Sequence, residues 1–138
     1  MAFDLDFTIP GKPMGKQRPR MTRTGHVFTS KETVAYENLV KLCFLEAYPY
    51  WTPTDAEVSM HIFADFPIPS SWSKKKKQAA LEGKIHPRKP DWDNIGKIIS
   101  DGLNSVAFKD DAQIYACNVM KRYAETPKVM VLIVIETG

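Results

Sequence analysis

The last apolar segment of the chain most strongly limits the folds that it can adopt. Val129–Ile135 consists of seven consecutive apolar residues, bounded by Lys128 and Glu136. The run is far shorter than the roughly 20 apolar residues of a membrane-spanning helix, and it has the length of a strand. Because it is apolar on both faces, a strand of this kind belongs in the middle of a sheet. We therefore predict a sheet that has this segment as a central strand.

The remaining segments show either the period of two of a half-buried strand or the longer period of a helix. Strands are expected at Phe3–Ile9, Val58–Phe66, Gln113–Tyr123 and Val129–Glu136, the last two joined by a turn at Glu125–Lys128. Helices are expected from Ser30 to about Ala47, from Ser71 or Ser73 to Leu81, and from about Asp93 to Val106. Between the first strand and the first helix, residues 11–29 form a basic loop with a short hairpin around Gly25. This order predicts one α+β domain, residues 1–138, with helices packed on a mixed sheet.

Composition excludes several other classes of protein. A hydrophobic fraction of 43% rules out pervasive disorder. The two cysteines, Cys43 and Cys117, are too few for a disulfide scaffold, and we expect free thiols in a reducing compartment. The first ten residues contain two aspartates and no basic residue, so we expect no signal peptide. These features predict a cytoplasmic protein.

Charge is segregated along the chain, although the net charge is only +3. Residues 11–23 hold five basic residues and no acid, and residues 72–90 hold seven basic residues against Glu82 alone. Residues 91–111 then hold five aspartates. Basic patches attract polyanions such as nucleic acid, whereas an acidic cluster repels phosphate unless a divalent cation lies between them. The layout is typical of a metal-dependent nuclease, although Lys74–Lys77 fits a solvated helix face equally well.

The aspartates are spaced so that they could share one cation. Asp91 and Asp93 are one residue apart at the predicted start of the third helix, and Asp93, Lys97 and Asp101 follow one another at intervals of four. Asp110–Asp111 precede a predicted strand, which could return one of them to the same place. Hard oxygen ligands without nearby histidine or cysteine suit magnesium or manganese rather than zinc.

Each of these aspartates also has a purely structural interpretation. Aspartate is a favoured N-cap, and the helix dipole stabilises acids in the first helical turn. Asp93 and Lys97 could form an ordinary helix pair worth about 0.2–0.5 kcal/mol, and Asp110–Asp111 could be turn residues. Spacing alone leaves both interpretations open.

The segment KPDWDNIGKIISDGLNSVAFKDDAQI, residues 89–114, resembles the Holliday junction resolvases of the RusA type. It contains the family pattern D-x-D-N-x-x-K, then D-[AG]-L, then D-D-x-Q before a strand. A second likeness lies in IPGKPMGKQRPR, residues 9–20, which is similar to the N-terminal strand and basic loop of the family. The resemblance covers most of the chain.

The resemblance implies a homodimeric endodeoxyribonuclease that resolves four-way junctions and other branched DNA by symmetric paired nicks, in recombination and repair. It implies magnesium as the cofactor, for which manganese substitutes. Asp91 and Asp93 match the paired catalytic and metal-binding aspartates, Asp111 the third essential carboxylate, and Lys97 the catalytic lysine. Asp101 and Asp110 match supporting positions.

DNA contacts are expected from the basic residues Lys12, Lys16, Arg18, Arg20, Arg23, Arg88 and Lys89. Trp92, which lies between the two catalytic aspartates, is expected to pack rather than to take part in chemistry. Two rival functions remain. One is a DNA-binding module of the same fold that is catalytically idle or has a different specificity. The other is a metal-dependent phosphatase of small molecules, against which the two basic segments favour a long polyanion.

Overall fold

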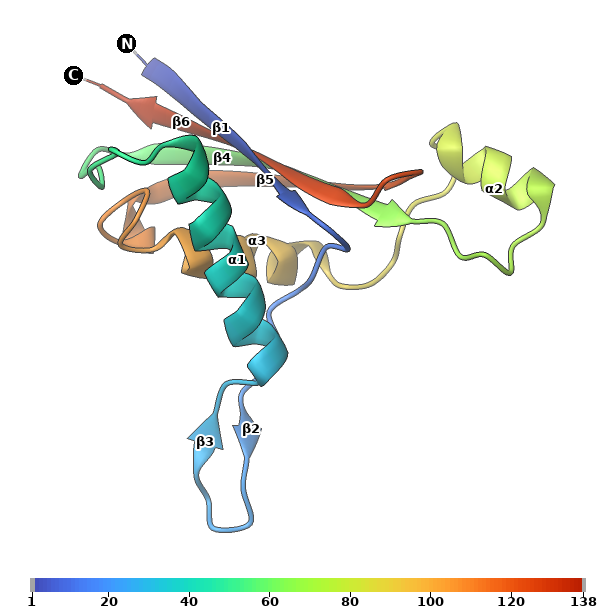
Figure 1. Ribbon diagram of the computed structural model, residues 1–138, viewed down its shortest axis with the longest axis horizontal. Coiled ribbons are helices and arrows are strands. Elements are labelled where there is room, and N and C mark those ends of the chain that lie inside the picture. Colours follow the sequence, from blue (N-terminus) through green and yellow to red (C-terminus); the bar gives the residue numbers. More distant parts are fainter. Residues whose placement is uncertain (1, 138) are drawn as a thin grey trace.

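The central sheet of the computed structural model, which describes residues 2–137, has four strands in the order β1-β6-β4-β5 (Figure 1). These strands are β1 (Ala2–Pro10), β4 (Val58–Pro67), β5 (Ile114–Ala124) and β6 (Lys128–Glu136). β6 lies between β1 and β4 and pairs antiparallel with both. Its alternate side chains, from Val129 to Ile135, are at most 1% exposed. The prediction of a central strand is therefore confirmed.

β5 is an edge strand that pairs parallel with β4, so the sheet is mixed as predicted. The short turn after β5 leads into β6, but the two strands are not neighbours because β4 lies between them. The turn therefore does not close a hairpin, although the two strands are consecutive in the chain.

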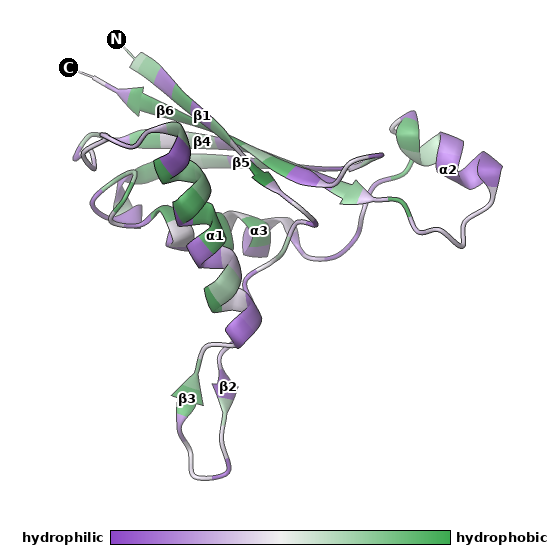
Figure 2. Ribbon diagram, in the orientation of Figure 1, coloured by the Kyte–Doolittle hydropathy of each residue, from purple (hydrophilic) through white to green (hydrophobic). Residues whose placement is uncertain are grey.

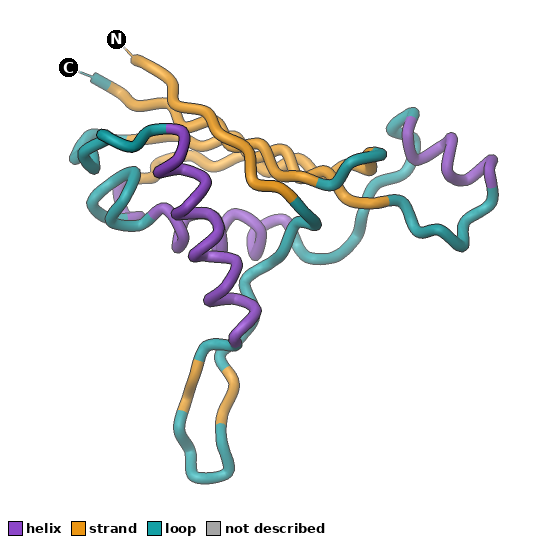
Figure 3. Tube along the Cα trace, in the orientation of Figure 1, coloured by secondary structure: helices purple, strands orange, loops and turns teal. Residues whose placement is uncertain are grey.

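Two helices lie on the same side of the sheet, α1 (Lys31–Ala47) and α3 (Trp92–Leu103) (Figures 1 and 3). Ser30 begins α1, and its hydroxyl accepts a hydrogen bond from the Thr33 backbone N–H. The apolar residues of α3 form one buried stripe, since Ile95, Ile98, Ile99 and Leu103 are fully covered. This stripe closes the core between the sheet and α1.

α3 is shorter than the sequence predicts. It ends at Leu103 rather than at Val106, because Asn104 has an extended backbone and Ser105 a left-handed one, with φ 70°. The chain turns here so that the Ser105 N–H donates to the Phe108 carbonyl. Phe108 itself is fully buried in the core.

Two smaller elements project from this body. A hairpin of β2 (Arg20–Met21) and β3 (Val27–Phe28) extends beyond the start of α1, and α2 (Lys74–Leu81) lies beyond the end of β4 (Figure 1). Gly25 has the positive φ that the predicted hairpin turn requires. Ser73 caps α2, and its lysine-rich first turn is the hydrophilic end of the helix in Figure 2.

The fold is α+β, as predicted, with one hydrophobic core. Among residues 2–137, no helix combines the length and the apolar character needed to cross a membrane.

Candidate active site

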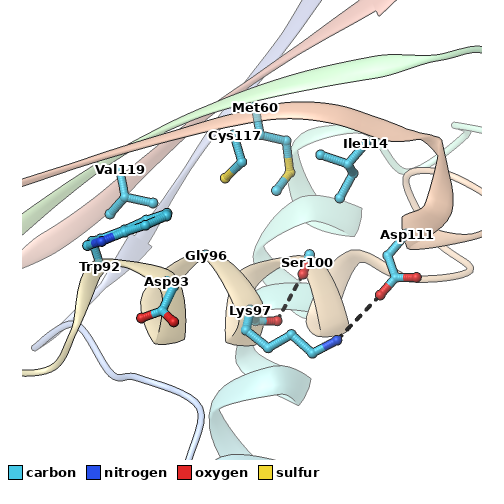
Figure 4. A pocket seen from close by; sticks show the side chains of 10 residues that line it. All are labelled: Met60, Trp92, Asp93, Gly96, Lys97, Ser100, Asp111, Ile114, Cys117 and Val119. Carbon is cyan, nitrogen blue, oxygen red and sulfur yellow. Dashed lines mark hydrogen bonds and ion pairs between the residues drawn. The ribbon is translucent and has the colours of Figure 1, made fainter.

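A cavity of about 270 Å³ lies between α3, β4, β5 and the short 3-10 helix η1 (Asp111–Gln113) (Figure 4). Three of the predicted catalytic residues line it, namely Asp93, Lys97 and Asp111. The rest of its lining is mostly apolar, from Met60, Trp92, Gly96, Ser100, Ile114, Cys117 and Val119. The fold thus brings Asp93 and Lys97 of the D-x-D-N-x-x-K pattern together with Asp111 of the D-D-x-Q pattern.

The first two aspartates lie at the N-terminus of α3. Asp91 has the extended backbone of an N-cap, but its carboxylate makes no capping hydrogen bond. Asp93 lies in the first turn, and its Oδ1 accepts from the Asn94 N–H at 3.0 Å. Both side chains are exposed, and Asp91 is not part of the cavity lining. Asp91 therefore occupies the N-cap position of α3, but its carboxylate does not act as the cap.

The Lys97 ammonium lies beside two acidic side chains, Asp101 and Asp111. Its Nζ lies 3.3 Å from Asp101 Oδ1 and 3.6 Å from Asp111 Oδ2; Figure 4 marks the second contact. Within the described residues Lys97 forms no ion pair with Asp93. Its ion pair along the helix is with Asp101, four residues later. Lys97 consequently links the helix to the segment that carries Asp111.

The two adjacent aspartates before β5 have different surroundings. Asp110 is exposed, and its N–H donates to Gln113 Oε1 at 2.9 Å. The Gln113 Nε2 in turn donates to the carbonyls of Thr54 and Ala56 at 2.8 and 2.7 Å. These bonds anchor η1 to the segment before β4 and present Asp111 to the cavity. Gln113 belongs to the recognised motif, but its anchoring role was not anticipated.

Lys16 lies inside rather than on the outer surface of the basic loop. Its Nζ donates to Glu37 Oε2 of α1 at 2.6 Å and lies 3.0 Å from Asp101 Oδ2 of α3. Burial alone would lower the pKa of Lys16, but its bonds to Glu37 and Asp101 outweigh burial and raise the pKa. Lys16 therefore carries a full positive charge at neutral pH. Glu37 drew no functional prediction, since no local pattern connects α1 with this loop.

The other basic residues predicted to bind DNA remain available. Arg18, Arg20 and Arg23 are exposed on the loop and hairpin, whereas Lys12, Arg88 and Lys89 line a second cavity of about 340 Å³. Within residues 2–137 these six residues form no ion pair with an acid. The Lys121 ammonium donates to the Arg88 and Pro90 carbonyls at 2.7 and 3.1 Å, which ties this segment to β5.

Lys74–Lys77 on α2 likewise have no acidic partner in the described part of the chain. The Lys76 Nζ lies 4.0 Å from the centre of the Trp72 ring, which packs against Tyr123 of β5. These contacts place the start of α2 beside β5.

Trp92 is more exposed than predicted. Its side chain is 59% exposed, and it lies along the rim of the cavity instead of in the core (Figure 4). It occupies the first position of α3, where the apolar stripe that faces the sheet has not yet begun.

The donor chemistry of the site fits a hard divalent cation, since Asp93 and Asp111 offer carboxylate oxygens to one cavity. The described residues nevertheless contain no group of three acids and histidines close enough to hold a metal together. The cation nearest to Asp111 is the Lys97 ammonium. Binding of a metal by Asp91, Asp93 and Asp111 therefore requires these side chains to approach one another.

Carboxylates and a lysine around one cavity, with exposed basic segments elsewhere on the same domain, fit an enzyme that hydrolyses phosphodiesters. Residues 10–134 match the family model of endodeoxyribonuclease RusA, and the chain belongs to this family. It is thus a DNA endonuclease of the Holliday junction resolvase type. The chain is also 36% identical over 135 residues to the uncharacterized protein YqaN of Bacillus subtilis (strain 168), with 94% of each chain covered.

Proposed function

We propose that this protein is a magnesium-dependent endonuclease that resolves four-way DNA junctions by paired, symmetric nicks. The observation that carries the proposal is the cavity that Asp93, Lys97 and Asp111 share. Exposed basic residues without acidic partners elsewhere in the described structure support it. We expect the protein to act in the cytoplasm, in DNA recombination and repair. Manganese is expected to replace magnesium, since both prefer oxygen ligands.

In this proposal the carboxylates of Asp91, Asp93 and Asp111 hold the metal. A bound magnesium ion lowers the pKa of its water and neutralises charge on the phosphate oxygens. Lys97 lies beside the same cavity and stabilises negative charge that develops on the phosphate or on the leaving oxygen. Asp101 and Asp110 support this arrangement from outside the cavity lining.

The basic segments position the DNA. Lys12, Arg18, Arg20, Arg23, Arg88 and Lys89 contact phosphates, which fixes orientation without reading sequence. A four-way junction has approximate two-fold symmetry, so a homodimer with two-fold symmetry can present two sites to opposed strands. Paired nicks follow from that symmetry.

The test is cleavage of a synthetic four-way junction with magnesium, with manganese and with EDTA, beside a duplex of the same sequence. We expect symmetric nicks with either metal, none with EDTA, and little cutting of the duplex. Junction binding without cleavage in any metal would instead support the idle DNA-binding module. Hydrolysis of p-nitrophenyl phosphate without junction cleavage would support a small-molecule phosphatase.

A further inference from the structure

Five charged side chains of alternating sign form a continuous network beside the cavity. Glu37 contacts Lys16, Lys16 contacts Asp101, Asp101 contacts Lys97, and Lys97 contacts Asp111. The four contacts measure 2.6, 3.0, 3.3 and 3.6 Å, so they lengthen toward the cavity. The network joins the basic loop, α1, α3 and η1.

Asp101 is the central member of this network. Its Oδ2 lies against Lys16 and its Oδ1 against Lys97, so the two lysines hold both oxygens of one carboxylate. Lys16 and Asp101 are only 24% and 21% exposed, whereas Lys97 is 54% exposed. Salt therefore screens the inner part of the network less than its outer end.

Close backbone packing makes these contacts possible. A Cβ on Gly102 would lie 2.8 Å from Val40 Cβ and 3.1 Å from the Glu37 carbonyl, so α1 and α3 approach here as no larger residue allows. A Cβ on Gly15 would lie 2.6 Å from Pro90 Cβ. The Lys16 N–H also donates to the Asn94 carbonyl at 2.8 Å. The backbone therefore fixes Lys16 against the start of α3.

We propose that Lys16, Glu37 and Asp101 are positioning residues that hold the Lys97 ammonium beside Asp111. The inference rests on the proposed function for the role of Lys97, but the network itself does not depend on it. Lys16 acts as a fixed countercharge rather than as a DNA contact. Without Lys16, no cation lies between the Glu37 and Asp101 carboxylates. The Asp101 carboxylate, which orients Lys97, then loses the partner that fixes its Oδ2.

The matched pair for the test is Lys16→Met and Lys12→Met. Lys12 lies on the same loop, is exposed and has no acidic partner in the described residues. For Lys16→Met we expect single-turnover cleavage at saturating magnesium to fall about 10- to 100-fold, as for loss of a group that orients a catalytic residue. Junction affinity and its salt dependence should stay unchanged, and Lys16→Arg should restore most of the rate.

Lys12→Met should instead act on binding. The salt dependence of junction binding should fall by about one unit for the lost phosphate contact. A Lys16→Met variant that behaves like Lys12→Met would overturn the proposal. So would a Lys16→Met variant with the wild-type rate and affinity.

Two further measurements keep the test independent of folding and of activity. Glu37→Gln keeps a hydrogen-bonding group and removes only charge, so it should lower the rate even if Lys16→Met unfolds. In the metal-free protein, ¹⁵N NMR of lysine ammonium groups should show a shifted Lys97 signal in Asp101→Asn and Lys16→Met, but not in Lys12→Met. An unmoved Lys97 signal would contradict the network. If the wild-type protein cuts no junction, the proposed function fails while this NMR result still decides the positioning.

Discussion

Lys16 and Arg18 belong to one basic loop, yet they lie in different electrostatic environments. Lys16 is held between Glu37 and Asp101, and its pKa is raised by them. Arg18 is exposed and has no acidic partner among residues 2–137. The sequence pattern treats both as members of one basic patch, but only the second is free to meet phosphate. Local charge density therefore overestimates the DNA-binding surface wherever the fold supplies acids.

The same contrast separates the centre of the molecule from its projecting segments. In the body, Lys97 pairs with Asp101 and Asp111, and Arg122 pairs with the buried Asp65. On the hairpin and α2, the basic residues have no such partners in the described structure. If the paired cations position the site and the unpaired cations bind DNA, as proposed, the two regions should respond to mutation in different measurements.

The largest effect is expected from Asp93→Asn, a substitution in the body of the molecule. It should abolish cleavage, because the variant loses a carboxylate ligand, while junction binding stays intact or becomes tighter as repulsion of phosphate falls. Asp91→Asn should behave alike. Cleavage assays and gel-shift titration measure the two properties separately. Near wild-type cutting with magnesium by either variant would show that the metal ligands lie elsewhere.

Lys97→Ala should lower the cleavage rate by about 100- to 1,000-fold, the usual cost of losing one preorganised electrostatic group. The helix should persist, since alanine is the best helix former and the lost ion pairs are partly exposed. Single-turnover cleavage and thermal melting are the measurements. A rate within threefold of wild type, or a collapse of the melting temperature, would make Lys97 a structural partner of Asp101 and Asp111 only.

Gly102→Ala should disrupt the central network through packing rather than charge. The added methyl group would meet Val40 and the Glu37 carbonyl, and such overpacking costs about 1–3 kcal/mol of the free energy of unfolding. Gly96→Ala is the control in the same helix, because its new Cβ would approach Cys117 Sγ no closer than 3.4 Å. Urea denaturation measures both. Equal stabilities would show that α1 and α3 do not need their close approach.

Arg18→Ala combined with Arg20→Ala should affect only the outer region. The salt dependence of DNA binding should fall by about 1–2 units if each arginine contacts one phosphate, for junction and duplex alike. The rate on saturated DNA should remain that of the wild type. Binding measured at several salt concentrations tests this, and an unchanged slope would remove the loop from the DNA interface.

Much of the fold was predictable because burial repeats with the period of each element. The alternation in β1, the helical period of α3 and the double-sided apolar run of β6 are local patterns, and all three were confirmed. β4 also alternates in sequence, but Ser59 and Asp65 on its polar register are buried, because it lies inside the sheet. The end of α3 was not predictable, since Ser105 turns the chain to bury Phe108. The exposure of Trp92 also depends on where its helix meets the sheet.

The sequence alone determined the elements, the class of fold and the acidic motif, because each depends on residues that are near one another in the chain. Only the tertiary structure decided the strand order, the placement of Asp111 in one cavity with Asp93 and Lys97, and the partners of Lys16. The physical reason is that the role of a charged side chain depends on the groups that surround it in the fold. Lys16 meets Glu37 of α1 and Asp101 of α3 where the two helices approach closely at Gly102, and no local sequence pattern shows that distance.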